Sequence, residues 1–73
     1  MEKTKSSIKF LIMRYMLENF IENFTQLSEK TGIKYDTLNE HIKHPEKLRK
    51  WEIKLLDEAL HFSDEDLLRI IRS

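Results

Sequence analysis

The chain of 73 residues has no cysteine, a single glycine and a single proline. Without cysteine it can form neither a disulfide nor a thiolate nucleophile. So few helix-breaking residues, together with 36% charged residues, are typical of a mostly helical domain. The most apolar stretch, residues 8–24, is interrupted by charged side chains and falls short of the ~20 apolar residues of a membrane span. We therefore expect a cytoplasmic protein that does not enter a membrane.

Net charge is also absent, because thirteen basic and thirteen acidic residues balance. The charges are nevertheless grouped along the chain. Residues 1–17 carry four bases against one acid, and residues 18–29 carry three acids and no base. Residues 30–54 carry seven bases against four acids, whereas residues 55–73 carry two bases against five acids. A fold can gather the two basic blocks on one face, which would suit nucleic acid, or leave all four scattered over a solvated surface.

The apolar pattern predicts an all-α fold, a compact five-helix bundle. Residues 1–6 are polar and are expected to form a flexible N-terminal arm, and residues 7–73 a single domain. A domain of this size buries only roughly 60% of its unfolded surface, so its stability is marginal or depends on a partner. The expected helices run from residue 6 or 7 to about 20–22, over 24–31, from 35 to 42 or 43, over about 46–61 and over about 64–72.

Local signals set most of these boundaries. Asn23, followed three residues later by Gln26, is typical of a capping box at a helix start. Pro45 ends the third helix, since the residue before a proline disfavours the helical conformation. Ser63, followed by Asp66 at the same spacing, indicates the start of the last helix. In the fourth helix the 3.6-residue apolar stripe is Leu48, Trp51, Leu55, Leu56, Ala59 and Leu60.

The first helix has more apolar residues than one stripe needs. They are Ile8, Phe10, Leu11, Ile12, Met13, Tyr15, Met16, Leu17, Phe20 and Ile21. Either this helix is central to a small core, or its second apolar face is covered by another molecule, such as a second copy of the chain. The pattern alone leaves both readings open.

Gly32 lies between two helical patterns, and two short helices joined by a turn containing glycine form a helix-turn-helix. A chain that turns sharply out of a helix favours a residue that accepts left-handed backbone angles, and glycine does so without steric cost. Ser28, four residues earlier, is small enough for the second helix to cross nearby. We expect Leu27, Ile33 and Leu38 to point inward and set the angle between the helices.

At these residues the chain resembles a known family. The run Leu27-Ser28-Glu29-Lys30-Thr31-Gly32-Ile33 is similar to the L-A-E-K-T-G-I run of phage-repressor-like, Cro-type DNA-binding domains of the Xre family. Further on, Ala59-Leu60-His61-Phe62-Ser63 followed by Leu67-Leu68 resembles the A-L-x-V-S-x-x-x-L-L ending of that family. The similarity spans about residues 23–68. It implies a lambda-repressor-like fold in which the second and third helices form the helix-turn-helix.

The resemblance also implies a set of DNA contacts, because the second helix of such a unit enters the major groove. It places Lys34, Tyr35, Asp36, Glu40 and Lys43 at the groove, with Thr37 and Asn39 nearby. Lysine reads guanine or phosphate, asparagine pairs with adenine, and a carboxylate accepts from the cytosine amino group. The candidates for phosphate contacts are Lys43, His44, Lys47, Arg49 and Lys50.

The function that the resemblance implies is a sequence-specific DNA-binding transcriptional regulator of the small phage or plasmid repressor type. Its partner would be double-stranded DNA, read in the major groove by a weak homodimer. The alternative is a protein-interaction module that keeps the fold but has lost DNA binding. Zero net charge favours that alternative, and so do Phe24, which replaces the glutamine with which the family braces a phosphate contact, and the acidic Asp36 and Glu40.

Signals for catalysis are missing. The chain has no glycine-rich phosphate loop, no nucleophile in a catalytic setting and no marked acid–base pair. His41 and His44 have a spacing that can hold a metal on one helix face, but no third and fourth ligand stands out. Tyr15 and Trp51 are interpreted as core or interface residues. We therefore expect no enzyme activity, cofactor, bound metal or small-molecule substrate.

Overall fold

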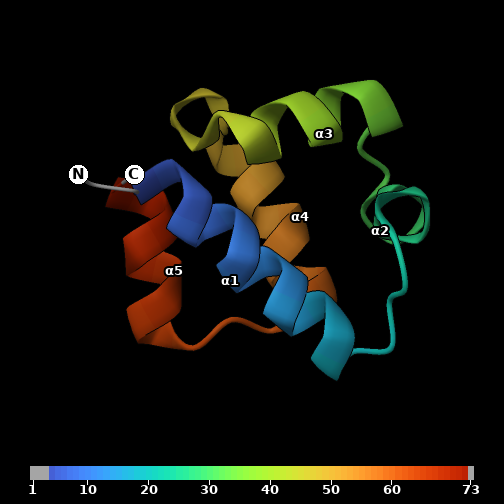
Figure 1. The fold of residues 1–73 in the computed structure, drawn as a ribbon, viewed down its shortest axis with the longest axis horizontal. Helices are drawn as coiled ribbons and strands as arrows, with labels where there is room; N and C mark the ends of the chain where they lie inside the picture. Colours follow the sequence, from blue (N-terminus) through green and yellow to red (C-terminus); the bar gives the residue numbers. More distant parts are fainter. Residues whose placement is uncertain (1–3, 73) are drawn as a thin grey trace.

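Five helices and one short 3-10 turn make up the computed structural model, which describes residues 4–72 (Figure 1). They are α1 (Thr4–Glu18), α2 (Phe24–Thr31), α3 (Tyr35–Lys43), the 3-10 turn η1 (Pro45–Lys47), α4 (Lys50–Leu60) and α5 (Asp64–Arg72). No strand occurs in this range, and the prediction of an all-α five-helix bundle is confirmed. Of the predicted N-terminal arm, residues 1–3 lie outside the described range and the backbone of residues 4–6 belongs to α1.

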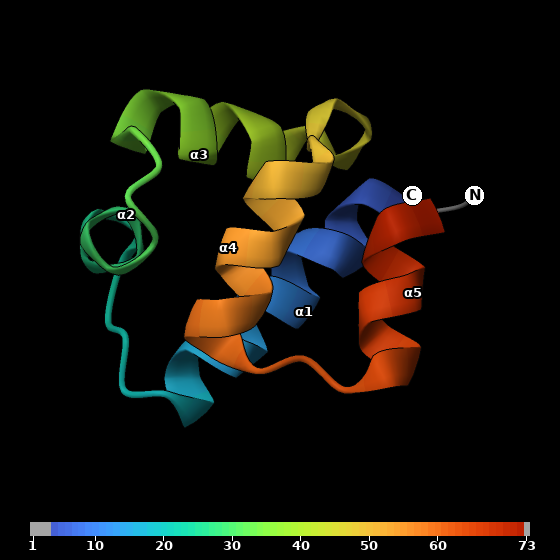
Figure 2. The same ribbon diagram turned by 180° about the vertical axis from the view of Figure 1, so that it is seen from behind.

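The helix-turn-helix stands at one end of the molecule and α5 at the other, with α1 and α4 between them (Figures 1 and 2). α3 packs against α1 and α2, while α4 packs against α2 and α5. The helix-turn-helix therefore packs against both central helices, α1 through α3 and α4 through α2.

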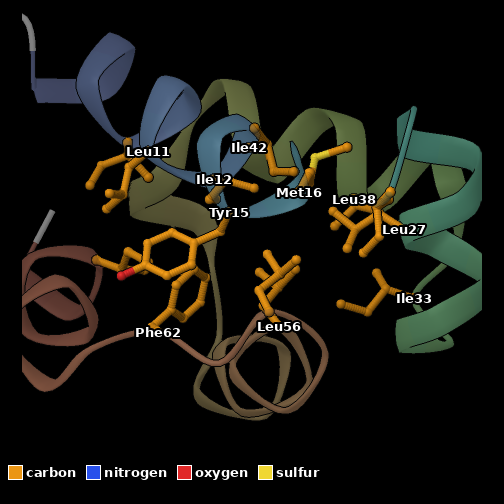
Figure 3. Close-up of a cluster of buried hydrophobic side chains, with 14 residues drawn as sticks. Leu11, Ile12, Tyr15, Met16, Leu27, Ile33, Leu38, Ile42, Leu56 and Phe62 are labelled. Atoms are coloured by element: carbon orange, nitrogen blue, oxygen red, sulfur yellow. The ribbon is translucent and has the colours of Figure 1, made fainter. Parts of the chain in front are cut away.

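The core lies where these helices meet (Figure 3). Tyr15 and Phe62 pack edge to face within it, with ring centroids 4.8 Å apart and planes at 83°. Leu27, Ile33 and Leu38 are buried, as predicted from the turn. The other buried apolar residues are Ile8, Leu11, Ile12, Met16, Ile21, Ile42, Leu56, Leu60 and Ile70.

Only one face of α1 enters this core. On the opposite face Phe10, Met13 and Leu17 are exposed to 64%, 42% and 77%, and Phe20 just beyond the helix to 90%. The helix also ends earlier than residues 20–22, because Phe20 adopts a left-handed conformation with a φ of 60°. The apolar excess of this helix is therefore a surface feature of the single chain.

The predicted start of the fourth helix at residue 46 is wrong. Pro45–Lys47 form a separate 3-10 turn, Leu48 and Arg49 are extended, and α4 begins at Lys50. The reason is a cap: the backbone N–H of Arg49 donates to the Glu52 carboxylate over 2.9 Å, which stabilises a helix start at this point.

Two residues of α4 also differ from the predicted stripe. Trp51 is 52% exposed and so does not belong to the core, whereas Glu52 is buried. Glu52 fills a core position because its carboxylate has partners: it lies 2.8 Å from His41 Nδ1 and accepts the Arg49 N–H.

The predicted capping boxes of α2 and α5 form only in part, because the second side chain of each box bonds elsewhere. Asn23 accepts from the backbone N–H of Gln26 over 2.9 Å, but the Gln26 side chain accepts from the N–H of Glu22 rather than from that of Asn23. Ser63 accepts from the N–H of Asp66 over 3.2 Å, while the Asp66 carboxylate accepts from the Tyr15 hydroxyl over 2.6 Å. Within residues 4–72, no helix has the length and apolar character to cross a membrane.

Candidate nucleic-acid interface

The turn between α2 and α3 has the conformation that its glycine predicted. Gly32 has a φ of 80° and a ψ of 4°, and its N–H donates to the carbonyl of Ser28 over 2.8 Å. These angles lie in the left-handed region, which a side chain makes costly. The turn assignment is therefore confirmed.

Side-chain hydroxyls close this turn further. The Ser28 hydroxyl donates to the carbonyl of Ile33, across the turn. The Thr31 hydroxyl donates to the carbonyl of Leu27 over 2.9 Å and accepts from the N–H of Ile33 over 3.2 Å. The sequence pattern required Ser28 only to be small, so these bonds were missed.

α3 is fixed to the core along one face and exposed along the other. Leu38 and Ile42 are fully buried. A third anchor is the contact of 2.8 Å between His41 Nδ1 and the buried carboxylate of Glu52 on α4. These contacts give α3 one orientation relative to the domain.

The exposed face of α3 presents most of the residues expected at the groove. Lys34 and Tyr35 are exposed at its start, and Asp36, Glu40 and Lys43 are exposed along it. Their spacing of three and four residues places Asp36, Glu40 and Lys43 on one ridge. The side chains of Thr37 and Asn39 are partly buried at the flanks of that ridge. The helix thus brings the candidate reading residues together.

An ion pair occupies one end of the ridge. Lys47 Nζ donates to the Glu40 carboxylate over 2.9 Å, and the His44 ring lies 4.0 Å from the same carboxylate. The hydrogen bond and charge of Lys47 lower the pKa of Glu40 below its ordinary value, so the carboxylate stays ionised at neutral pH. Lys47 therefore points back to α3 and does not stand free.

The other bases of this region remain available. Lys34, Lys43, Arg49 and Lys50 are exposed, and none of them forms an ion pair with another residue of the described range. They lie on α3 and at the start of α4. The two histidines of the metal motif have different neighbours, since His41 faces Glu52 and His44 lies 4.0 Å from Glu40 and from Glu46. No group of three potential metal ligands occurs among residues 4–72.

Comparison with known proteins gives one match. The family model of the Mga helix-turn-helix domain matches residues 1–61, which include α1 to α4. The match supports a helix-turn-helix DNA-binding domain but not the narrower Cro-type family that the turn residues resemble. No curated protein and no solved structure matches the chain.

Proposed function

Because the chain belongs to the Mga helix-turn-helix domain family, we propose that it is a sequence-specific DNA-binding regulator of transcription whose α3 enters the major groove. The observation that supports this proposal is that α3 has one face buried against the core and one face exposed to solvent. One face is locked to the core by Leu38, Ile42 and the His41–Glu52 contact. The other presents polar and charged side chains to solvent at the spacing of a single ridge.

Each side chain has a proposed task. Asn39 pairs with adenine, Lys34 contacts guanine or phosphate, and Asp36 accepts from the cytosine amino group. Tyr35 and Thr37 lie beside them at the groove. Phosphates are contacted by Lys43, His44, Lys47, Arg49 and Lys50, which set the register and supply salt-dependent affinity.

The Glu40–Lys47 pair modifies this scheme. A lysine that already neutralises a carboxylate releases fewer counterions when it meets a phosphate, because its charge is shared. Lys47 thus contributes less to affinity than Lys43. Glu40, because it is paired with Lys47, repels phosphates less than a free carboxylate would.

The regulator is proposed to act as small phage or plasmid repressors do, by occupying a site of two half-sites as a weak homodimer. A twofold protein reads a pseudo-palindromic site with both of its recognition helices. The small size of the domain and the extra apolar face on α1 support an assembly of this kind.

Binding to random duplex DNA across a series of salt concentrations tests the proposal. A steep loss of affinity with salt is expected from phosphate contacts by several lysines and arginines. The absence of binding even at low salt would favour the alternative, an interaction module with this fold. That alternative is supported by the zero net charge and by the two exposed carboxylates on α3.

Two variants compare the contribution of Lys43 to DNA binding with that of Lys47, which is paired with Glu40. Lys43→Ala should weaken binding to all sequences and flatten the salt slope by about one unit. Lys47→Ala should flatten it by clearly less, because Glu40 already neutralises that charge. Equal slopes for the two variants would show that the ion pair opens on DNA.

Variants on the ridge test sequence reading. Asn39→Ala should cost roughly 1–3 kcal/mol on the preferred site and leave binding to random DNA unchanged. Glu40→Gln should strengthen non-specific binding, because it frees Lys47 and removes a carboxylate that repels phosphate. If Asp36 reads a cytosine, Asp36→Asn should relax preference at one base pair. DNA affinity that none of these changes alters would show that α3 is not the reading helix.

A further inference from the structure

An open apolar groove runs along the outer side of α1 and has a volume of about 950 Å³. Its lining residues come from α1, from the loop that follows it and from the starts of α2 and α3. We call it the α1 groove, and its apolar lining includes Phe10, Met13, Leu17, Phe20, Phe24 and Tyr35. Within a single chain this surface faces solvent.

Phe20 is the most unusual residue of the groove. α1 ends in a Schellman motif: the N–H of Ile21 donates to the carbonyl of Met16 over 2.8 Å, and the N–H of Phe20 to that of Leu17 over 3.2 Å. The left-handed position of this motif normally holds glycine. Here it holds a phenylalanine with 90% of its surface exposed, so contacts within the chain offset little of the strain. Strain of this kind is typical of surfaces that bind something.

We propose that the α1 groove is the interface of a homodimer in which two α1 helices pack antiparallel. The inference deepens the proposed homodimer and does not depend on the proposed DNA contacts. Its basis is the symmetry of the pattern around residue 15. A twofold axis at that level places Phe10 opposite the partner's Phe20 and Met13 opposite the partner's Leu17, so each apolar side chain meets another.

The flanking charges match the same register. Arg14, which is 3.4 Å from Asp66 of its own chain but has a side chain that is 60% exposed, then lies near Glu18 of the partner subunit, and Lys9 lies near Glu22 of the partner subunit. The bases Lys9 and Arg14 of one chain thus lie near acids at and just beyond the end of α1 in its copy. A parallel pair would instead bring like charges together, which is unfavourable. Charge complementarity therefore favours a second copy of this chain, and favours it in one direction.

The exposed area fits a weak dimer. At roughly 150–250 Å² for a large side chain, the exposed fractions of Phe10, Met13, Leu17 and Phe20 add up to on the order of 500 Å². Two copies would bury on the order of 1,000 Å², about the minimum for a specific interface. The rival face on α5 offers only Leu68 and Ile71, each about half exposed.

Sedimentation equilibrium of the chain without DNA tests the interface apart from the proposed function. The natural chain should show a reversible monomer–dimer equilibrium. Phe20→Gly removes the aromatic ring while relieving the backbone, and it should weaken dimerisation at least tenfold in a monomer that folds fully by circular dichroism. The matched control is His61→Gly, which relieves the same kind of left-handed residue away from the groove and should leave the dimer unchanged.

Cross-linking tests the register, and the chain suits it because it has no native cysteine. A chain with Met13→Cys mixed with a chain with Leu17→Cys should form the mixed disulfide under mild oxidation. Each variant alone should cross-link at least fivefold less, since like positions are offset along the antiparallel pair. Faster cross-linking of like positions would overturn the antiparallel arrangement.

Three other results would also overturn the proposal. One is a strict monomer at millimolar concentration, and another is a dimer that Leu68→Ser dissociates and Phe20→Gly does not. The third is that the residues of the α1 groove become protected from solvent only when a different protein is added, which would show that this protein, and not a second copy of the chain, binds there. None of these results bears on DNA binding, which the salt series measures independently.

Discussion

α1 and α2 end in the same backbone conformation with opposite kinds of residue. The left-handed position after α2 is Gly32, with a φ of 80° and no atom within 4 Å of where a Cβ would lie. The corresponding position after α1 is Phe20, with a φ of 60° and a ring that faces solvent. After α2 the chain uses glycine, the residue that adopts left-handed angles at the least steric cost. After α1 it uses phenylalanine, and we attribute this choice to a contact that the ring makes outside its own chain.

A third left-handed residue extends this comparison. His61, with a φ of 57°, ends α4, and side chains hold the chain that follows. The Asp57 carboxylate accepts from the N–H of Phe62 over 3.1 Å, and the Tyr15 hydroxyl accepts from the N–H of Ser63 over 3.2 Å. The three helix ends are thus stabilised differently. We therefore expect substitutions at these ends to change the free energy of unfolding by different amounts.

Tyr15→Phe should have the largest effect. The hydroxyl donates to Asp66 and accepts from the Ser63 N–H, so its loss breaks a bond to a charged group and leaves a backbone donor unpaired. We expect a loss of roughly 1.5–3 kcal/mol in the free energy of unfolding. Urea unfolding at pH 7 measures it, and a change below 0.5 kcal/mol, of the size common for surface substitutions, would show that the turn after α4 does not need this bond.

The same variant should alter the response to acid. The hydroxyl of Tyr15 lowers the pKa of Asp66 below its ordinary value of 3.8. The unfolded chain therefore takes up this proton first, so stability falls as pH decreases below about 4 and through the lowered pKa. In Tyr15→Phe the difference in stability between pH 5 and pH 2.5 should shrink. An unchanged difference would assign the acid sensitivity to other carboxylates.

Gly32→Val should cost about 1–2 kcal/mol, because valine strains the left-handed angles although the site has open space. Gly32→Asn is the matched control, since asparagine tolerates these angles better and should cost less. Thermal unfolding of both variants checks the order. If Val and Asn cost the same, backbone strain is not the reason for this glycine.

Phe20→Gly should have the smallest effect and the opposite sign. Glycine relieves the left-handed strain but adds entropy to the unfolded chain, so the monomer should gain only ~0.5–1 kcal/mol. The measurement is urea unfolding at a concentration where the chain is monomeric. A loss of stability would mean that the ring of Phe20 packs within its own chain, and the comparison with Gly32 would fail.

The boundaries of α2 and the end of α3 were predictable because short-range signals control them. Asn23 and Gly32 delimit α2, and Pro45 follows α3, each through the backbone of its immediate neighbours. The left-handed Gly32 and the inward Leu27 follow from the same local reasoning. The resemblance at the turn led to the correct class of domain but not to the family whose model matches.

Contacts between distant residues were not predictable in this way. Glu52 is buried because His41, eleven residues earlier, lies against it, whereas a periodicity count treats glutamate as solvent-facing. Trp51 is correspondingly turned outward. The Glu40–Lys47 pair depends on the 3-10 turn at Pro45–Lys47, whose residues 46 and 47 were predicted to belong to the fourth helix.

The hydroxyl bonds of Ser28 and Thr31 also have a consequence for motion. Because they tie the last turn of α2 to Ile33, the two helices can separate only when the surrounding core opens as well. The amide of Ile33 should then exchange with deuterium about as slowly as the most protected core amides. If α3 reads DNA as proposed, a helix held in this way is ordered before it binds, so little conformational entropy is lost on binding.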